Sequence, residues 1–458
     1  MRRSLAAATV SLVFAFTPPA RAQEPGEEDP ARSAPSSSPE PTPTPTSPVD
    51  TEVLARLERL EAEVAELRSR PAPPSSEPAV LQPTVLGELD YRVYPSEIEG
   101  NTGFALARLR PGLVLTPTPW LRAVTVLEFA DEHPIILDAF ARLRPAEWVE
   151  FTAGYSKPPL FASFVYEPVH TMPFPDRAPV VSAFRVRRDL GVDVHLAPRT
   201  VPLEGWLRVG NGTGSSLGND NALPAGYAAL DLVLGRAWAG AAPEDRTYGL
   251  RLGGAALVES PRDRNGITGQ TPLGFVYFRP IVVSGLRVVG EGHVIGYAGP
   301  LRLTVEGAVA REERSRDDDG NPETPRLQLP VVHSYGITAE LAWVLLGRPR
   351  DVGRAPGAAV GQDGEWNGGA LEIAARYDGM WLGEGASDVR SGGSQGGALA
   401  VKWWPTDFLA ASLAGYVTRY DTPPLEEPND LWSWGALARL SFFWGLPGQP
   451  SPMRVQWE

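Results

Sequence analysis

The chain has 458 residues and a formal charge of −13, from 42 Lys and Arg against 55 Asp and Glu. This acidic balance argues against a general nucleic-acid-binding protein, because such proteins need positive charge to contact phosphates. The absence of cysteine excludes disulfide scaffolds, thiolate zinc sites and cysteine nucleophiles. No two of the five histidines have the spacing of metal ligands on a helix. We therefore expect neither a metal site nor a cofactor.

The N-terminus has the pattern of a secretory signal peptide. Two arginines precede an apolar stretch from Leu5 to Phe16, and Ala20-Arg21-Ala22 follows as a cleavage signature. A membrane anchor is the alternative, but the apolar stretch is too short to cross about 30 Å of hydrocarbon. The sequence therefore predicts a signal peptide over residues 1–22.

A short coiled coil between two linkers is predicted next. Residues 23–50 and 71–83 are rich in Pro and Ser and are expected to be linkers. Between them, residues 51–70 carry apolar side chains at alternating spacings of four and three, the heptad pattern. These side chains are Val53, Leu57, Leu60, Val64 and Leu67. A helix of about twenty residues is marginal alone in water, so it should associate with copies of itself or with another protein. The alternative is a single amphipathic helix lying on the main domain.

Residues 84–458 show a period of two, which is typical of β-strands with one apolar face. In Leu301–Val309, for example, leucine and valine alternate with Arg302 and Glu306. Sixteen such strands are predicted, at 84–94, 102–115, 120–130, 134–144, 147–155, 188–197, 203–210, 226–236, 246–258, 285–297, 301–311, 333–345, 369–382, 397–404, 408–420 and 432–444. Because 271–283 is also strand-like and Met453–Trp457 follows the last strand, eighteen strands are an alternative.

Two kinds of fold show this alternation: a soluble β-sandwich, and a membrane barrel that turns its apolar face to lipid. The segments are about ten residues long, which is the length of a tilted membrane-spanning strand. Aromatic residues such as Trp120, Trp148 and Tyr248 lie near strand ends, where bilayer interfaces favour them. Short turns with Pro or Gly alternate with longer polar connections. The sequence therefore predicts an all-β protein, a transmembrane antiparallel β-barrel in the outer membrane of a Gram-negative cell. Its two ends should lie in the periplasm.

The polar positions of the strands are expected to face the lumen. They include Arg108, Arg122, Glu128, Arg208, Arg251, Arg302, Glu306, Glu340, Glu372, Arg376, Lys402 and Arg439. Such charges either steer permeating ions or pair across neighbouring strands and keep the lumen wet. Most of them are expected to play the second role.

Residues 156–187 form the longest break between strong strands and contain six prolines and four phenylalanines. Long segments of this kind are usually functional or disordered, and the aromatic content argues against disorder. We expect the segment to fold into the lumen and narrow it; the alternative is an outer-surface loop packed against a neighbouring subunit. Its cations and the adjoining Arg188 are the candidate selectivity residues: Lys157, Arg177, Arg185, Arg187 and Arg188.

Enzymatic activity is not expected. The sequence has no G-x-S-x-G element, and His195 fits an ordinary strand position. The acidic run from Asp317 to Asn321 lacks the spacing and the closing glutamate of an EF-hand loop. It is expected to be a solvated acidic loop.

Several stretches resemble the phosphate-selective porin O and P family. Tyr335–Leu346 and Gly369–Tyr377 are similar to late strands of that family, and Val401–Tyr416 is similar to its turn between two strands. Gly154–Val194 resembles its long loop after an early strand, and the resemblance covers about residues 85–445. It implies a sixteen-stranded, trimeric outer-membrane channel for small anions or polar solutes. An N-terminal coiled coil also occurs in relatives.

The chain departs from that family in its charges. Phosphate-selective members use Lys and Arg clusters, whereas residues 81–458 hold 34 Lys and Arg, only two of them Lys, against 43 Asp and Glu. We therefore expect a porin for passive diffusion of small hydrophilic solutes or ions, with mild anion preference. The expected partners are outer-membrane lipid, permeating solutes and two further copies of the chain. The alternative is a structural or adhesive barrel that its coiled coil tethers in the periplasm.

Overall fold

The computed structural model describes residue 56 and residues 80–94, 102–130, 133–215, 218–221, 223–235, 237–238, 248–317, 325–350, 354–356, 368–406, 408–424 and 431–445. The predicted signal peptide and first linker lie outside these residues, as do the coiled coil apart from Arg56, most of the second linker, and Met453–Trp457. The chain divides into two units, Met1–Ser76 and Glu77–Glu458, and the second contains the barrel.

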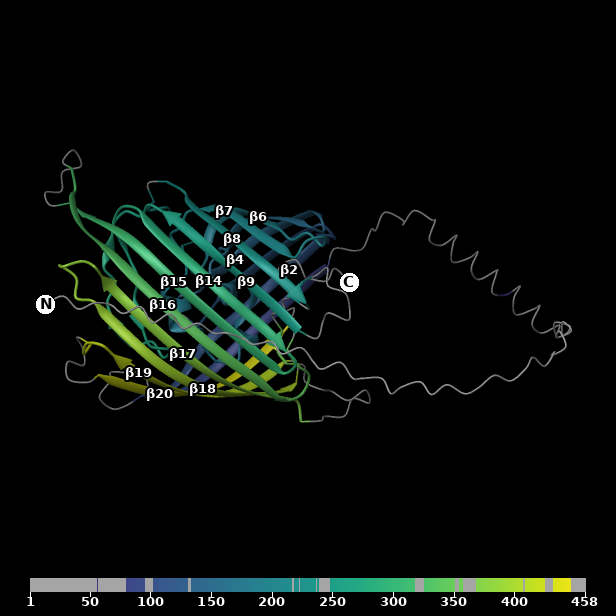
Figure 1. Ribbon diagram of the computed structural model, residues 1–458. Helices are drawn as coiled ribbons and strands as arrows, with labels where there is room; N and C mark the ends of the chain where they lie inside the picture. Colours follow the sequence, from purple (N-terminus) through teal and green to yellow (C-terminus); the bar gives the residue numbers. More distant parts are fainter. Residues whose placement is uncertain are drawn as a thin grey trace, which may run out of the picture. The chain divides into compact units, whose positions relative to one another are not determined.

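Sixteen antiparallel strands form one closed barrel in chain order, as the sequence predicted (Figure 1). They are β1 (Val80–Val93), β2 (Gly103–Thr118), β3 (Leu121–Glu128), β4 (Ile135–Ala146), β5 (Val149–Ser156), β6 (Asp189–Leu196), β7 (Leu203–Gly210), β8 (Ala225–Gly235), β9 (Tyr248–Glu259), β14 (Arg287–Ala298), β15 (Leu301–Arg316), β16 (Leu327–Leu346), β17 (Ala370–Glu384), β18 (Gly392–Thr406), β19 (Leu409–Tyr420) and β20 (Trp432–Trp444). β1 begins four residues earlier than predicted, within the expected second linker.

The barrel closes where β1 pairs with β20. At this seam Asp90 lies opposite Arg439, whose Nε and Nη2 donate to the two carboxylate oxygens at 2.6 and 2.9 Å. Both side chains are buried. The polar inner faces of β1 and β20, which lie at opposite ends of the chain, are therefore joined by a two-point ion pair.

The outer face of the barrel is apolar and the inner face is charged. Along β15, Leu301, Leu303 and Val309 are exposed, whereas Arg302 and Glu306 are buried. A soluble sandwich has the reverse arrangement, so this alternation belongs to a barrel surrounded by lipid. Exposed aromatic side chains form a girdle near the end of the barrel that carries the two-residue turns: Trp120, Trp148, Tyr248, Trp343, Trp403 and Trp444.

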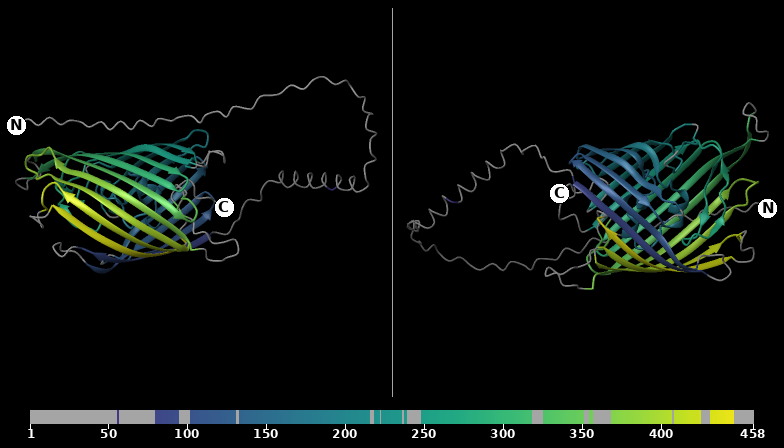
Figure 2. Two further views of the ribbon diagram at one scale, coloured as in Figure 1. Left: turned by 60° about the horizontal axis from the view of Figure 1, so that its bottom comes forward. Right: turned by 180° about the vertical axis from the view of Figure 1, so that it is seen from behind.

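The wall is uneven in height, as the two views of Figure 2 also show. β15 and β16 have 16 and 20 residues, longer than predicted, whereas β5, β6 and β7 have 8 each. Strands need about 9–11 residues to cross a bilayer at their usual tilt. The lowest part of the wall therefore lies at β5–β7.

The eighteen-strand alternative is wrong. Residues 260–286, between β9 and β14, contain two small sheets outside the barrel order. These sheets pair β10 (Arg264–Asn265) with β13 (Val282–Val283), and β11 (Gly269–Gln270) with β12 (Val276–Phe278). Ile267 and Phe278 are buried against inner-face residues of the barrel. The strand-like pattern of this connection therefore reflects packing inside the barrel rather than membrane crossing.

The described helices are short. α2 (Ala162–Tyr166), η1 (Val169–Thr171) and α3 (Pro179–Phe184) all lie in the connection between β5 and β6. Among the described residues, no helix has both the length and the apolar character needed to cross a membrane.

Candidate functional site

The connection between β5 and β6, residues 157–188, lies inside the barrel. Phe161 and Phe184 are almost fully buried. They pack with Val289 on the inner face of β14 and with Ala308 on that of β15. This is the inward position that the sequence predicted, and it excludes a loop on the outer surface. We call residues 157–188 the lumen loop.

Hydrogen bonds hold the lumen loop to distant parts of the wall. The backbone N and Oγ of Ser163 donate to the carboxylate of Glu306 on β15, at 2.8 and 2.5 Å. On β18, Lys402 Nζ donates to the carbonyl oxygens of His170 and Met172 at 2.9 and 2.8 Å. Four further wall arginines bond to the loop: Arg108, Arg302, Arg376 and Arg439. The loop is therefore anchored to strands that lie far from its own ends.

All twelve side chains predicted to face the lumen lie inside the barrel. Eleven belong to buried residues, and the side chain of Arg108 is 14% exposed. Most are paired: Arg208 with Asp193 at 2.7 Å, Arg251 with Glu204 at 2.8 Å, and Arg302 with Glu340 at 2.6 Å. The greater part of the inner charge therefore stabilises the wall and the lumen loop.

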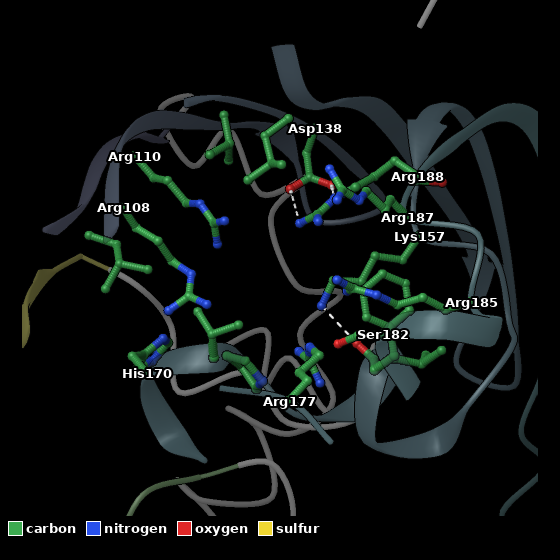
Figure 3. A pocket seen from close by; sticks show the side chains of 18 of the residues that line it. Arg108, Arg110, Asp138, Lys157, His170, Arg177, Ser182, Arg185, Arg187 and Arg188 are labelled. Carbon is green, nitrogen blue, oxygen red and sulfur yellow. Dashed lines mark hydrogen bonds and ion pairs between the residues drawn. The ribbon is translucent and has the colours of Figure 1, made fainter. Parts of the chain in front are cut away.

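A cavity of about 370 Å³ lies between the inner face of β1–β5 and the lumen loop. Nine cations line it: Arg108, Arg110, Arg122, Arg142, Lys157, Arg177, Arg185, Arg187 and Arg188. The lining holds three carboxylates, those of Asp138, Asp176 and Asp193. Figure 3 shows Arg108 and Arg110 on one side of the opening and Lys157, Arg185, Arg187 and Arg188 on the other. The cavity thus gathers all five predicted selectivity residues.

Several of the nine cations are compensated. Arg142 pairs with Glu150 and Arg188 with Asp138, at 3.3 and 3.2 Å, and Arg108 and Arg110 pair with Glu88 and Glu128. In contrast, no carboxylate of the described residues lies within 4.0 Å of Arg122, Arg185 or Arg187. The Nε atoms of Arg122 and Arg185 are buried without a hydrogen-bond partner in the described structure. The cavity therefore has a net positive charge.

Phe164 organises the cations of the lumen loop. Its ring centroid lies 5.0 Å from Lys157 Nζ, 5.1 Å from the guanidinium carbon of Arg177 and 4.5 Å from that of Arg185. Arg188 is also within cation–π range, at 5.9 Å. Lys157 Nζ and Arg177 Nη1 donate to the carbonyl oxygens of Phe164 and Ser163, at 2.9 and 2.6 Å. One aromatic ring and these carbonyls thus hold four like charges together.

Burial and the neighbouring Arg177 charge lower the pKa of Lys157 well below its usual range. The arginines around it remain charged at all ordinary pH values. Lys157 is therefore the cation of the lumen loop whose charge responds to pH.

Two more connections contribute to the inner structure. Gln270, Thr271 and Pro272 of the β9–β14 connection line the same cavity. From the β16–β17 connection, Arg350 Nε donates to Glu372 at 2.5 Å, and Nη1 bonds to the carbonyl oxygen of Thr171 in η1. For the cavity lining and for the bond to Thr171, the contacting segments are about a hundred or more residues apart in the chain. The pattern of residues within one segment therefore gave no signal for either contact.

The sequence also missed the place of Arg142 in the cavity. A local signal for Arg142 exists, because it occupies an inward position of β4 directly opposite Arg122 of β3. Two like charges at facing positions are unfavourable without a compensating anion, which marks this pair as unusual.

No protein-family model and no curated protein matches the chain. Among solved structures, it is similar to the outer-membrane channel DcaP of Acinetobacter baumannii, with 10% identity and a TM-score of 0.51 over 81% of this chain and 99% of that chain. The anion-selective porin from Comamonas acidovorans is similar with 10% identity and a TM-score of 0.50, over 80% and 100% of the two chains. A loop-deletion mutant of OmpT, an outer-membrane protein of Vibrio cholerae, has 11% identity and a TM-score of 0.50 over the same shares. The chain therefore has the fold of outer-membrane barrels, and its resemblance to the phosphate-selective family stays a prediction.

Proposed function

We propose that the protein is an outer-membrane porin for passive diffusion of small solutes, with a preference for anions. The observation that carries this proposal is the cavity lined by nine cations and three carboxylates inside a barrel with an apolar outer face. Fixed charges around a narrow water column concentrate counter-ions and so favour their passage. One of the similar barrels is described as an anion-selective porin, which agrees with this direction.

Conductance of the purified protein in a planar bilayer tests the proposal. We expect discrete conductance steps, and a zero-current potential in a KCl gradient that shows chloride to be preferred over potassium. Absence of conductance would contradict the porin function and would favour a structural barrel. Conductance with potassium preferred would contradict the anion preference alone.

The protonation of Lys157 should make the anion preference depend on pH. As pH rises through the lowered pKa of Lys157, the ammonium group loses its proton and the cavity loses one positive charge. The preference for chloride should therefore decline as pH rises through values well below 10, a range over which an ordinary lysine with a pKa of about 10.4 would stay largely charged. Zero-current potentials measured across this range check the prediction. The variant Lys157→Arg should keep a constant preference, and an equal decline in that variant would assign the effect to another group.

We infer that the end of the barrel with the two-residue turns, such as the turn between β4 and β5, faces the periplasm and that the opposite end faces the cell exterior. The antiparallel order places the β15–β16 connection and the β4–β5 turn at opposite ends of the barrel, with Val80 and Trp444 at the turn end. Because the chain has no native cysteine, single cysteines report accessibility directly. A membrane-impermeant maleimide should label Asn321→Cys in intact cells and Glu147→Cys only after the outer membrane is permeabilised. The reverse pattern would invert this topology.

We also infer that three copies associate through the low part of the wall. A groove of about 600 Å³ lies across β6–β9 and includes the short strands β6 and β7. Its lining includes Val194, Leu196, Gly205, Leu207, Ala229, Leu230, Gly254 and Ala256. Leu207 and Leu230 are 64% and 62% exposed. Short strands expose an apolar band that lipid matches only by thinning, which has a free-energy cost, so cover by a second copy is favourable.

A bulky side chain in this groove should prevent association. A Cβ atom added at Gly205 would meet no atom closer than 3.8 Å, so Gly205→Phe should fold and yield monomers in mild detergent. Gly415→Phe on β19, where nothing lies within 4 Å, is the matched control and should leave the assembly intact. Light scattering with size-exclusion chromatography measures the mass. An unchanged mass for Gly205→Phe would place the contact elsewhere.

A chain lacking residues 24–76 keeps all sixteen strands and should still insert.

A further inference from the structure

The cavity has an apolar side that the charge pattern does not explain. Val114, Val124 and Phe140 lie directly opposite one another across β2, β3 and β4, in one row on the inner wall. All three line the cavity. The lumen of a porin is normally polar because water fills it, so an apolar row at the candidate constriction requires a reason.

The lumen loop presents a second apolar surface to the same cavity. Val165, Pro168 and Val169 are half-buried and belong to its lining. Val124, Val126 and Phe140 on the wall are also half-buried. Each of these side chains therefore keeps part of its apolar area in contact with the solute pathway, where burial by an apolar group would be favourable.

Cations adjoin this apolar row on the strands themselves. Arg122 and Arg142 face each other across β3 and β4. Arg122 comes two residues before Val124 in β3, and Arg142 comes two residues after Phe140 in β4. Two residues of a strand span about 7 Å. Since Arg122 has no carboxylate of the described residues within 4.0 Å, its charge is available to an anion. Arg185 on the lumen loop, which also has no carboxylate of the described residues within 4.0 Å, adds a second unpaired charge to the cavity.

We propose that the channel favours organic monocarboxylates with an apolar body, aromatic or branched, over inorganic anions and over polyhydroxylated acids. The carboxylate would pair with an arginine of the cavity, and the apolar body would lie against Val124, Val126 and Phe140. A cavity of about 370 Å³ lies within the usual range for small organic ligands. This proposal rests on the proposed anion-preferring porin and narrows its solutes.

The test compares two anions that carry one carboxylate each, benzoate and gluconate. Their permeabilities relative to chloride come from zero-current potentials across a planar bilayer with different anions on the two sides. In the native protein benzoate should be favoured over gluconate by more than the ratio of their mobilities in water. Replacing Val124 and Val126 by threonine keeps the side-chain shape and adds hydroxyl groups. The relative permeability of benzoate should then fall about fivefold, since apolar contact area is lost, while that of gluconate stays constant.

The wall variant changes two barrel positions and could fail to insert, so a second variant targets the lumen loop. Val165→Thr with Val169→Thr should lower benzoate permeability in the same direction and leave the wall intact. The native channel could prefer chloride to potassium and yet pass benzoate and gluconate with a permeability ratio equal to the ratio of their mobilities in water. This result would overturn the present proposal and leave the porin proposal standing. A native channel that prefers potassium would overturn both. Equal loss of benzoate and gluconate in the threonine variants would overturn the role of the apolar row.

Discussion

Replacing Arg185, Arg187 and Arg188 together by glutamine should convert the anion preference into a cation preference. All three side chains line the cavity, and none of the described carboxylates pairs with Arg185 or Arg187. Arg188 pairs with Asp138 at 3.2 Å, so its loss also exposes a negative charge to permeating ions. A unit charge about 4 Å from an ion contributes about 1 kcal/mol even in water. The ratio of chloride to potassium permeability should therefore fall at least about fivefold, as zero-current potentials in a KCl gradient would measure.

The matched control replaces Asp317, Asp318 and Asp319 by asparagine. This change also alters the net charge by three units, but it lies beyond the end of β15, in the β15–β16 connection. Charges more than about 10 Å apart are screened in 0.1 M salt, so the control should hardly move the zero-current potential. A shift in the aspartate variant without a shift in the arginine variant would show that the cavity does not determine selectivity.

Replacing Phe164 by alanine should loosen the lumen loop and raise the single-channel conductance. Phe164 is 1% exposed, packs in the inner apolar cluster and lies within cation–π range of four cations. Removing a buried phenylalanine typically costs about 3–5 kcal/mol. Each lost cation–π contact adds about 0.5–1 kcal/mol. Much of this cost should fall on loop docking, because the barrel strands keep their own hydrogen bonds. We expect larger and noisier current steps, with weaker anion preference.

Phe164→Leu separates packing from the cation–π contacts. Leucine keeps an apolar side chain at this position but lacks the aromatic ring that attracts the cations. We expect conductance near that of the native protein with a reduced anion preference. If leucine and phenylalanine gave the same selectivity, the ring would serve packing only. If alanine left both conductance and noise unchanged, the lumen loop would not narrow the pathway.

The sixteen strands could be derived from the sequence because alternation is a local property. In β15, the exposed Leu301 and Leu303 and the buried Arg302 and Glu306 follow from the pleat of the strand alone. The inward position of the lumen loop was also predictable, because phenylalanines such as Phe161 need a surface on which to pack. Its cations could be named from the sequence for the same reason: they accompany the apolar anchors in one segment.

Only the tertiary structure decided which of these charges act together. Arg142 meets the lumen-loop cations because barrel closure and loop docking join segments that the chain order separates. The β9–β14 connection has a strand-like pattern although Ile267 and Phe278 are buried inside the barrel, because alternation alone does not distinguish an apolar face against lipid from one against protein. Strand register placed Val124 opposite Phe140 and thereby created an apolar row beside the arginines. Pattern within one segment sets which face a side chain occupies, whereas register and long-range packing set its neighbours.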